Sequence, residues 1–79
     1  MDKKLYDKVM SGKADYNIGF RDFEKLIKDL GFSLKSKKGS HKTYSNASIN
    51  ERITILPEGS KAKSYNVSDL RDIIKAHGL

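Results

Sequence analysis

His41 is the side chain in this sequence best suited to acid–base chemistry. It follows Gly39-Ser40 at the predicted start of a strand, within a segment rich in lysine. The imidazole group has an unperturbed pKa close to neutral pH, so it can both accept and donate a proton there. A histidine that leaves a glycine turn in a positive segment suits chemistry on a phosphodiester. The alternative interpretation is an ordinary surface histidine.

The residues before His41 are suited to binding a phosphate group. Gly39 permits a positive φ and close approach of a ligand to the backbone, and the Ser40 hydroxyl can donate to a phosphate oxygen. A Ser-His pair is also found in serine hydrolases. Adjacent strand residues point to opposite faces, however, and no third side chain that would complete a catalytic triad is evident. Gly39 and Ser40 therefore offer groups that could bind a phosphate beside His41. A plain hairpin turn is the alternative.

A second segment, Lys61-Ala62-Lys63-Ser64-Tyr65-Asn66, precedes the last predicted helix. Amide groups at a helix N-terminus favour anions, and two lysines reinforce them. The segment is either a phosphate clamp or a solvated loop whose Ser64 and Asn66 cap the helix. Tyr65 either stacks on a base or fills the core.

No cluster of residues has the composition of a metal site. His41 and His77 are isolated, and most acids belong to helix surfaces. The chain contains no cysteine, which excludes disulfides, thiolate zinc sites and a cysteine nucleophile and fits a reducing cytoplasm. We expect no metal and no small-molecule cofactor. His77 stands in a last helical turn, where the dipole favours a cation, and its predicted role is structural.

Hydrophobic periodicity predicts three helices. A short helix covers about residues 2–12. The second helix begins after Gly19, ends at Gly31, and has one apolar stripe formed by Phe20, Phe23, Leu26, Ile27 and Leu30. The third covers about residues 67–77, with Asn66 as its N-cap.

Three strands are predicted between the second and third helices, at residues 32–37, 40–45 and 52–56. A turn is predicted at Pro57-Glu58-Gly59-Ser60. The order helix, helix, three strands, helix predicts an α+β fold, a three-stranded antiparallel sheet with helices on one face. If the apolar strand residues point at the helices, alternation places Lys35, Lys37, His41, Thr43, Arg52 and Thr54 on the other face.

The charge of the chain indicates a polyanionic partner. Its 79 residues suit one small domain and include 16 lysines and arginines against 10 acids, a formal charge of +6. Such an excess favours nucleic acid as the binding partner, and to a lesser degree an anionic membrane. The alternative is a protein whose lysines are only solvated. The residues expected to bind RNA are Lys35, Lys37, Lys38, Lys42, Arg52, Lys61 and Lys63. No apolar run approaches a membrane span and no signal peptide is visible, so we expect a cytoplasmic protein.

The pattern Gly39-Ser40-His41-x-x-Tyr44, followed by a β-rich segment and Lys61-Ala62-Lys63-x-Tyr65-x-Val67, resembles the HicA family of toxins. The resemblance extends upstream to Ile18-Gly19-Phe20-x-x-Phe23 and Leu30-Gly31-Phe32. It implies one HicA-like domain over residues 1–79, with a core at 18–79 and an N-terminal helical extension at 1–15.

The resemblance implies a fold related to double-stranded RNA-binding domains and an activity, the cleavage of mRNA that arrests translation. By analogy His41 is catalytic, with Gly39 and Ser40 around it. The implied partner is a HicB-type antitoxin that covers the active surface. This chain departs from the family pattern at two positions. Family members often have a second histidine where this chain has Lys42, and a proline where it has Ser64.

The leading hypothesis is therefore a small, metal-independent endoribonuclease toxin. A non-catalytic module that binds double-stranded RNA is the first alternative, because the same charge and fold suffice for shape recognition without a histidine. A protein-binding domain with an acidic partner is the second.

Overall fold

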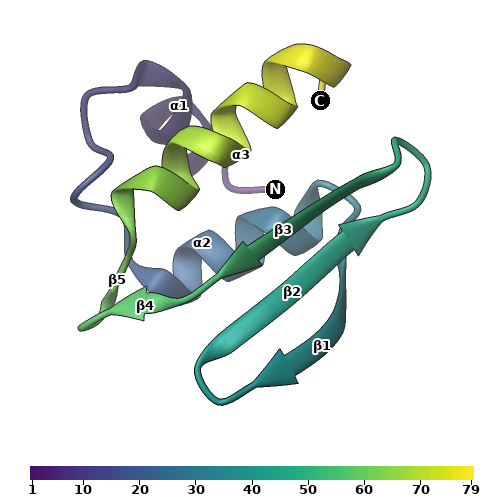
Figure 1. Ribbon diagram of the computed structural model, residues 1–79. Coiled ribbons are helices and arrows are strands. Elements are labelled where there is room, and N and C mark those ends of the chain that lie inside the picture. The colour runs from purple at the N-terminus through teal and green to yellow at the C-terminus, as the bar shows by residue number, and fades with distance from the viewer.

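The computed structural model describes residues 1–79 and contains three helices and a three-stranded antiparallel sheet, β1-β2-β3 (Figure 1). The elements are α1 (Lys3–Ser11), α2 (Phe20–Asp29), β1 (Ser33–Lys38), β2 (His41–Asn46), β3 (Glu51–Ile55), β4 (Pro57–Glu58), β5 (Lys61–Ala62) and α3 (Ser64–His77). The predicted α+β class and element order are confirmed. The turn predicted at residues 57–60 is confirmed, as the Gly59-Ser60 turn of a short β4–β5 hairpin. The relation to double-stranded RNA-binding domains stays a prediction.

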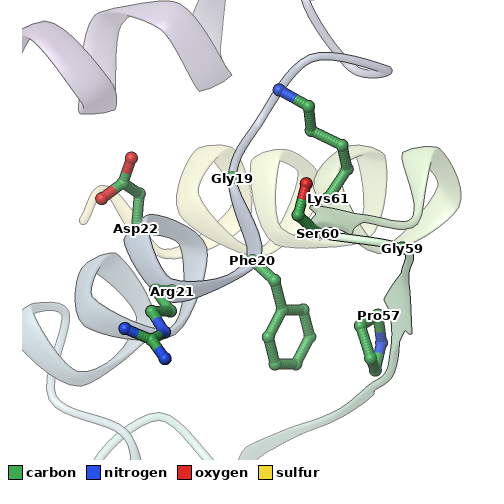
Figure 2. Close-up of a pocket in the computed structure, with 8 residues that line it drawn as sticks. All are labelled: Gly19, Phe20, Arg21, Asp22, Pro57, Gly59, Ser60 and Lys61. Carbon is green, nitrogen blue, oxygen red and sulfur yellow. The ribbon is translucent and has the colours of Figure 1, made fainter.

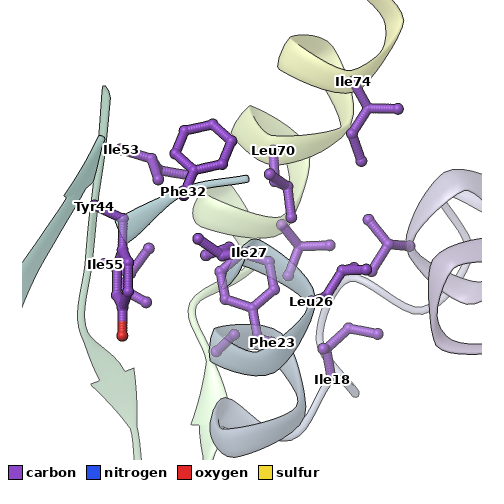
Figure 3. Packing of buried hydrophobic residues seen from close by; sticks show 13 residues of the cluster. Ile18, Phe23, Leu26, Ile27, Phe32, Tyr44, Ile53, Ile55, Leu70 and Ile74 are labelled. Carbon is purple, nitrogen blue, oxygen red and sulfur yellow. The ribbon is translucent and has the colours of Figure 1, made fainter. Parts of the chain in front are cut away.

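The helices cover one face of the sheet, and the core lies between the two layers. Figure 3 shows side chains of the sheet projecting toward those of α2 and α3. The buried hydrophobic residues are Val9, Ile18, Phe23, Leu26, Ile27, Phe32, Tyr44, Ile53, Ile55, Ala62, Val67, Leu70 and Ile74. Full burial of a large aliphatic or aromatic side chain contributes roughly 1.5–3 kcal/mol. No comparable layer covers the opposite face of the sheet (Figure 1). None of the three helices has the length and apolarity needed to span a bilayer.

The end of α2 fixes the direction in which the chain enters the sheet. Gly31 has φ +97°, its N–H donates to the carbonyl of Lys28, and the N–H of Phe32 donates to the carbonyl of Ile27. These paired bonds form the Schellman motif predicted from the sequence. Phe32 is thereby returned to the core directly before β1.

The start of α3 differs from the prediction. The helix begins at Ser64, after Lys63, and Asn66 lies inside its first turn with only 2% of its surface exposed. The Asn66 Nδ2 donates to the carbonyl oxygen of Thr54 at 3.0 Å. The prediction of Asn66 as N-cap is therefore wrong, because its amide ties the helix to β3 instead.

The β2–β3 pair is regular, with Thr43 opposite Thr54 and Tyr44 opposite Ile53. Tyr44 and Ile53 are buried against the helices, so their neighbours on either side along the strands face outward. The predicted outward positions of His41, Thr43, Arg52 and Thr54 are confirmed by this register. We call this surface of the three-stranded sheet the outer face.

The β1 strand carries a β-bulge between Leu34 and Ser36, which leaves Lys35 as the extra residue. Beyond the bulge, Lys37 pairs with Lys42, a residue whose side chain reaches α2. Lys37 therefore lies on the helix-facing side of the sheet, and the prediction that it points outward is wrong. The bulge shifts the alternation by one residue, and no apolar pattern in this strand marks it.

The N-terminal segment is tied to α3 by a forked ion pair. Arg71 Nη1 and Nη2 donate to the Asp15 carboxylate oxygens at 2.8 and 3.0 Å, and Nη1 also donates to the Val9 carbonyl. These hydrogen bonds from Arg71 lower the pKa of Asp15. The Tyr6 hydroxyl donates to the Leu79 carbonyl at 2.7 Å, so both ends of the chain are joined.

Candidate functional site

A two-residue turn places His41 at the exposed end of the sheet. Gly39 has φ +57° while Ser40 does not have a positive φ, which is the pattern of a type II′ hairpin. The turn joins Lys38 to His41, and these two residues pair across the strands. A side chain at position 39 would meet no atom within 4 Å, so the positive φ, rather than space, favours glycine there.

The outer face around His41 is lined by hydroxyl groups. His41 and Thr43 share this face, and Thr43 Oγ1 lies 2.9 Å from Thr54 Oγ1 on the neighbouring strand. The register gives the hydroxyl-bearing residues of the face as Ser33, Ser36, Thr43, Ser45 and Thr54. Hydroxyls both donate and accept hydrogen bonds, so they suit phosphate oxygens and ribose 2′-hydroxyls alike.

Three of the predicted RNA-binding cations stand on or beside the outer face. Lys38 is opposite His41, and Arg52 is opposite Ser45. Lys35, Ser45 and Arg52 line a shallow hollow of about 280 Å³ beside the loop between β2 and β3. Ser45 is four residues from His41, about 13 Å along the strand. The structure thus brings His41, Lys35, Lys38 and Arg52 onto one continuous surface.

Lys42 is not part of that surface. Its Nζ donates to Glu24 Oε2 on α2 at 2.8 Å and lies 5.8 Å from the centroid of the Phe20 ring. Because this ammonium group already has a carboxylate partner, its charge is largely neutralised. Lys42 and Lys37 therefore lie on the other side of the sheet from the predicted RNA contacts.

Glu24 also accepts a hydrogen bond from the Tyr44 hydroxyl at 2.8 Å. Burial raises the pKa of Glu24, but the hydrogen bonds from Lys42 and Tyr44 outweigh it and lower the pKa overall. Burial, together with the bond to this carboxylate, raises the pKa of Tyr44 to about 12. Sequence reasoning missed the cluster, although Lys42 and Tyr44 are two residues apart and so share the face that packs on α2.

Lys61 and Lys63 stand on the β4–β5 hairpin and at the start of α3, apart from the three-stranded sheet. Lys61 Nζ donates to Asn17 Oδ1 at 3.0 Å, and Lys63 Nζ lies 3.6 Å from Glu58 Oε1. Tyr65 is 54% exposed, so it does not fill the core. The segment therefore lies at a helix N-terminus with both lysines already engaged by side chains, and its role as a phosphate clamp stays a prediction.

A pocket of about 500 Å³ lies between the first turn of α2 and the β4–β5 hairpin (Figure 2). Its walls include Phe20 and Arg21 from α2 and Pro57 and Lys61 from the hairpin. The sequence analysis did not identify this pocket, because Phe20 belongs to the apolar stripe of α2 and Pro57 to a turn signal. The backbone bond from the Phe20 N–H to the Ser60 carbonyl at 2.8 Å holds the two elements together.

No three His, Asp or Glu side chains converge in a way that would hold a metal ion. His77 lies at the end of α3, where its Nε2 is 2.8 Å from Glu51 Oε2 at the start of β3. This contact ties α3 to the sheet, in keeping with the structural role predicted for His77.

The Glu24 cluster generates a prediction about acid stability. Because the folded protein lowers the pKa of Glu24 below its ordinary 4.5, the ionised carboxylate stabilises the fold. That contribution is present above about pH 4.5 and is lost as the pH falls through the lower folded pKa. At pH 7, Glu24→Gln should destabilise the protein by about 1–2 kcal/mol, measured by urea unfolding.

At pH 3, below the ordinary pKa of the carboxyl, part of this contribution has been lost, so the difference in stability between the two proteins should shrink. The matched comparison is therefore the same pair of proteins at two pH values. An equal difference at pH 7 and pH 3 would contradict the charged hydrogen bonds assigned to Glu24.

Comparison with known proteins adds one finding. Residues 20–79 match a family model described as HicA toxin of bacterial toxin-antitoxin. The match begins at the first residue of α2 and includes the whole sheet, the β4–β5 hairpin and α3. The α1 helix and the loop after it lie outside it. No curated protein matches the chain, and no solved structure does.

Proposed function

Since the chain belongs to the HicA family of toxins from bacterial toxin–antitoxin systems, we propose that it is a metal-independent endoribonuclease that cleaves mRNA and so inhibits translation. The observation that carries this proposal is the exposed position of His41 on an open, basic, hydroxyl-lined sheet face. Family membership implies an antitoxin partner. We propose a HicB-type protein that covers the outer face and removes His41 from RNA.

On this proposal the RNA strand lies along the outer face. Lys35, Lys38 and Arg52 neutralise phosphates, and the paired hydroxyls of Thr43 and Thr54 contact phosphate or ribose oxygens. The roughly 13 Å from His41 to Ser45 gives the strand a track with cations at both ends. The free charges on this face, in contrast to that of Lys42, are available to a polyanion.

His41 acts as the proton-transfer group. It takes the proton from a ribose 2′-hydroxyl as the 2′-oxygen attacks the adjacent phosphorus, and the bond from phosphorus to the 5′-oxygen breaks. The products are a 2′,3′-cyclic phosphate and, once the leaving oxygen is protonated, a 5′-hydroxyl. A positioned acid or base typically contributes 10²–10⁴-fold. The Lys38 ammonium, opposite His41, stabilises the negative charge that develops on the phosphoryl oxygens.

The two histidines of the chain form a matched pair for the first test. His41→Ala should lower the rate of RNA cleavage by at least about 10²-fold while leaving RNA affinity nearly unchanged. His77→Ala removes the other imidazole, which contacts Glu51, and should cleave at the wild-type rate. Single-turnover cleavage of labelled RNA and gel-shift affinity measure the two effects.

Equal cleavage by wild type and His41→Ala would refute the catalytic assignment. RNA retention without any cleavage would favour the double-stranded RNA-binding module. Absence of both RNA binding and RNA cleavage would favour a protein-binding domain. Induced expression of the same variants, with growth and transcript integrity followed together, extends the test to the cell.

The proposed mechanism also predicts the chemistry of the products. Cleavage should continue in EDTA and leave 2′,3′-cyclic phosphate ends, which mass spectrometry of a short oligonucleotide identifies. A single 2′-deoxy substitution at the cleaved nucleotide should abolish cutting there, because the attacking oxygen is missing. Products with a plain 3′-hydroxyl, or an absolute need for a divalent cation, would contradict this route.

The placement of the cations predicts unequal contributions to RNA binding. Arg52→Ala should weaken binding and reduce the salt slope, d log K/d log[salt], by about 0.7 for a single-stranded RNA, because one phosphate contact is lost. Lys25→Ala removes the same charge from the exposed surface of α2, behind the sheet, and should leave that slope unchanged. Equal slopes for both variants would contradict the proposed path of the RNA.

A further inference from the structure

We propose that the pocket between α2 and the β4–β5 hairpin receives one unpaired nucleobase of the RNA strand that His41 cleaves. This inference rests on the proposed function and adds a base-binding subsite to it. It would make the nucleotide next to the cleaved bond, rather than the sheet face, the main source of sequence preference.

The walls of the pocket suit a flat aromatic ligand. Phe20 and Pro57 both line it, and Figure 2 shows their rings on the same side of the ribbon with open space between them. Phe20 is only half-buried, so a face of its ring is accessible. Every nucleobase has a π face that stacks on such a ring, and a volume of about 500 Å³ is ample for one base.

The charges around the pocket favour a nucleotide over a neutral ring. Arg21 and Lys61 line it together with a single acid, Asp22, so the lining carries a net positive charge. The guanidinium group of Arg21 lies beside Phe20 on the side away from Pro57 (Figure 2). A nucleotide bound in the pocket would therefore have the guanidinium group of Arg21 at the margin of its site.

The pocket lies within reach of a strand bound at His41. Lys42, the residue after His41, projects to the opposite side of the sheet, where its Nζ lies 5.8 Å from the centroid of the Phe20 ring. The Gly39-Ser40 turn and the β4–β5 hairpin lie at the same end of the molecule (Figure 1). An RNA strand on the outer face can therefore pass around the end of β2 and place its next base against Phe20.

The outer face itself offers no such base contact. The register places on it hydroxyls, cations and His41, but no Phe, Tyr or Trp. These groups contact phosphate and ribose, which are the same in every nucleotide. A base in the pocket must leave any duplex, so the inference also requires that the cleaved RNA be single-stranded at that nucleotide.

The test uses variants of Phe20 in the non-cleaving His41→Ala protein, with RNA oligonucleotides that carry 2-aminopurine at successive positions. Stacking on Phe20 should quench the fluorescence at one position only. Phe20→Leu, which keeps bulk without a π face, should remove that quenching and weaken binding about tenfold. Phe20→Tyr should retain both, and Tyr16→Leu, at an 81% exposed aromatic outside the pocket, should behave as the parent.

A second measurement requires no change at Phe20. Oligonucleotides with 5-iodouridine at the quenched position should photocrosslink to Phe20, identified by mass spectrometry of the peptides. A third measurement uses the Phe20→Leu variant with His41 intact. Its cleavage pattern should lose the sequence preference at that nucleotide. Circular dichroism of each variant verifies that the fold is kept.

Failure of the subsite and failure of the nuclease give different results. Wild-type cleavage with an unchanged pattern and affinity in Phe20→Leu overturns the subsite alone. A Phe20→Leu protein that loses antitoxin binding but keeps RNA binding assigns the pocket to a protein partner and also overturns it. Absence of RNA binding and cleavage in the wild-type chain overturns the nuclease and the subsite together.

Discussion

The structure of the candidate site depends on the carboxylate of Glu24, which holds the inward-facing side of β2. Lys42 and Tyr44 are two residues apart and so lie on the same side of this strand. Each donates a hydrogen bond to the Glu24 carboxylate at 2.8 Å. Tyr44 is in addition buried in the core, so β2 cannot rotate without exposing the ring and breaking both bonds. Because strand side chains alternate, the same constraint directs His41 and Thr43 to the opposite side. His41 is thus positioned by contacts that lie on the other face.

This arrangement also divides the positive charge of the protein into two kinds. Some cations on the helix-facing side and beneath it have carboxylate partners, as Lys42 has Glu24 and Arg71 has Asp15. Those on the outer face, Arg52 among them, have none in the structure. The formal charge of +6 is a sum, so it does not show where on the surface the unpaired cations lie. On the proposed function, a polyanion would meet unpaired cations on the face that also carries His41.

The sequence predicted what depends on local or periodic signals and missed what depends on tertiary contacts. The stripe of α2 and its Gly31 end are local features, and both were predicted. The β-bulge at Lys35 was missed, because β1 contains only serine and lysine after Leu34 and so has no apolar period to define its register. The start of α3 was misplaced because Asn66 is a good cap by residue type, yet its amide bonds to β3. The Phe20 pocket was invisible because its walls come from segments far apart in the sequence.

A single imidazole on this face constrains the proposed mechanism. Two protons must move, one from the 2′-oxygen and one to the 5′-oxygen, and His41 is the only histidine or carboxylic acid that the register places on the outer face. Its neighbours Lys38, Thr43 and Thr54 stabilise charge and orient oxygens but do not exchange protons readily at pH 7. His41 must therefore return to the leaving oxygen the proton it took from the attacking one.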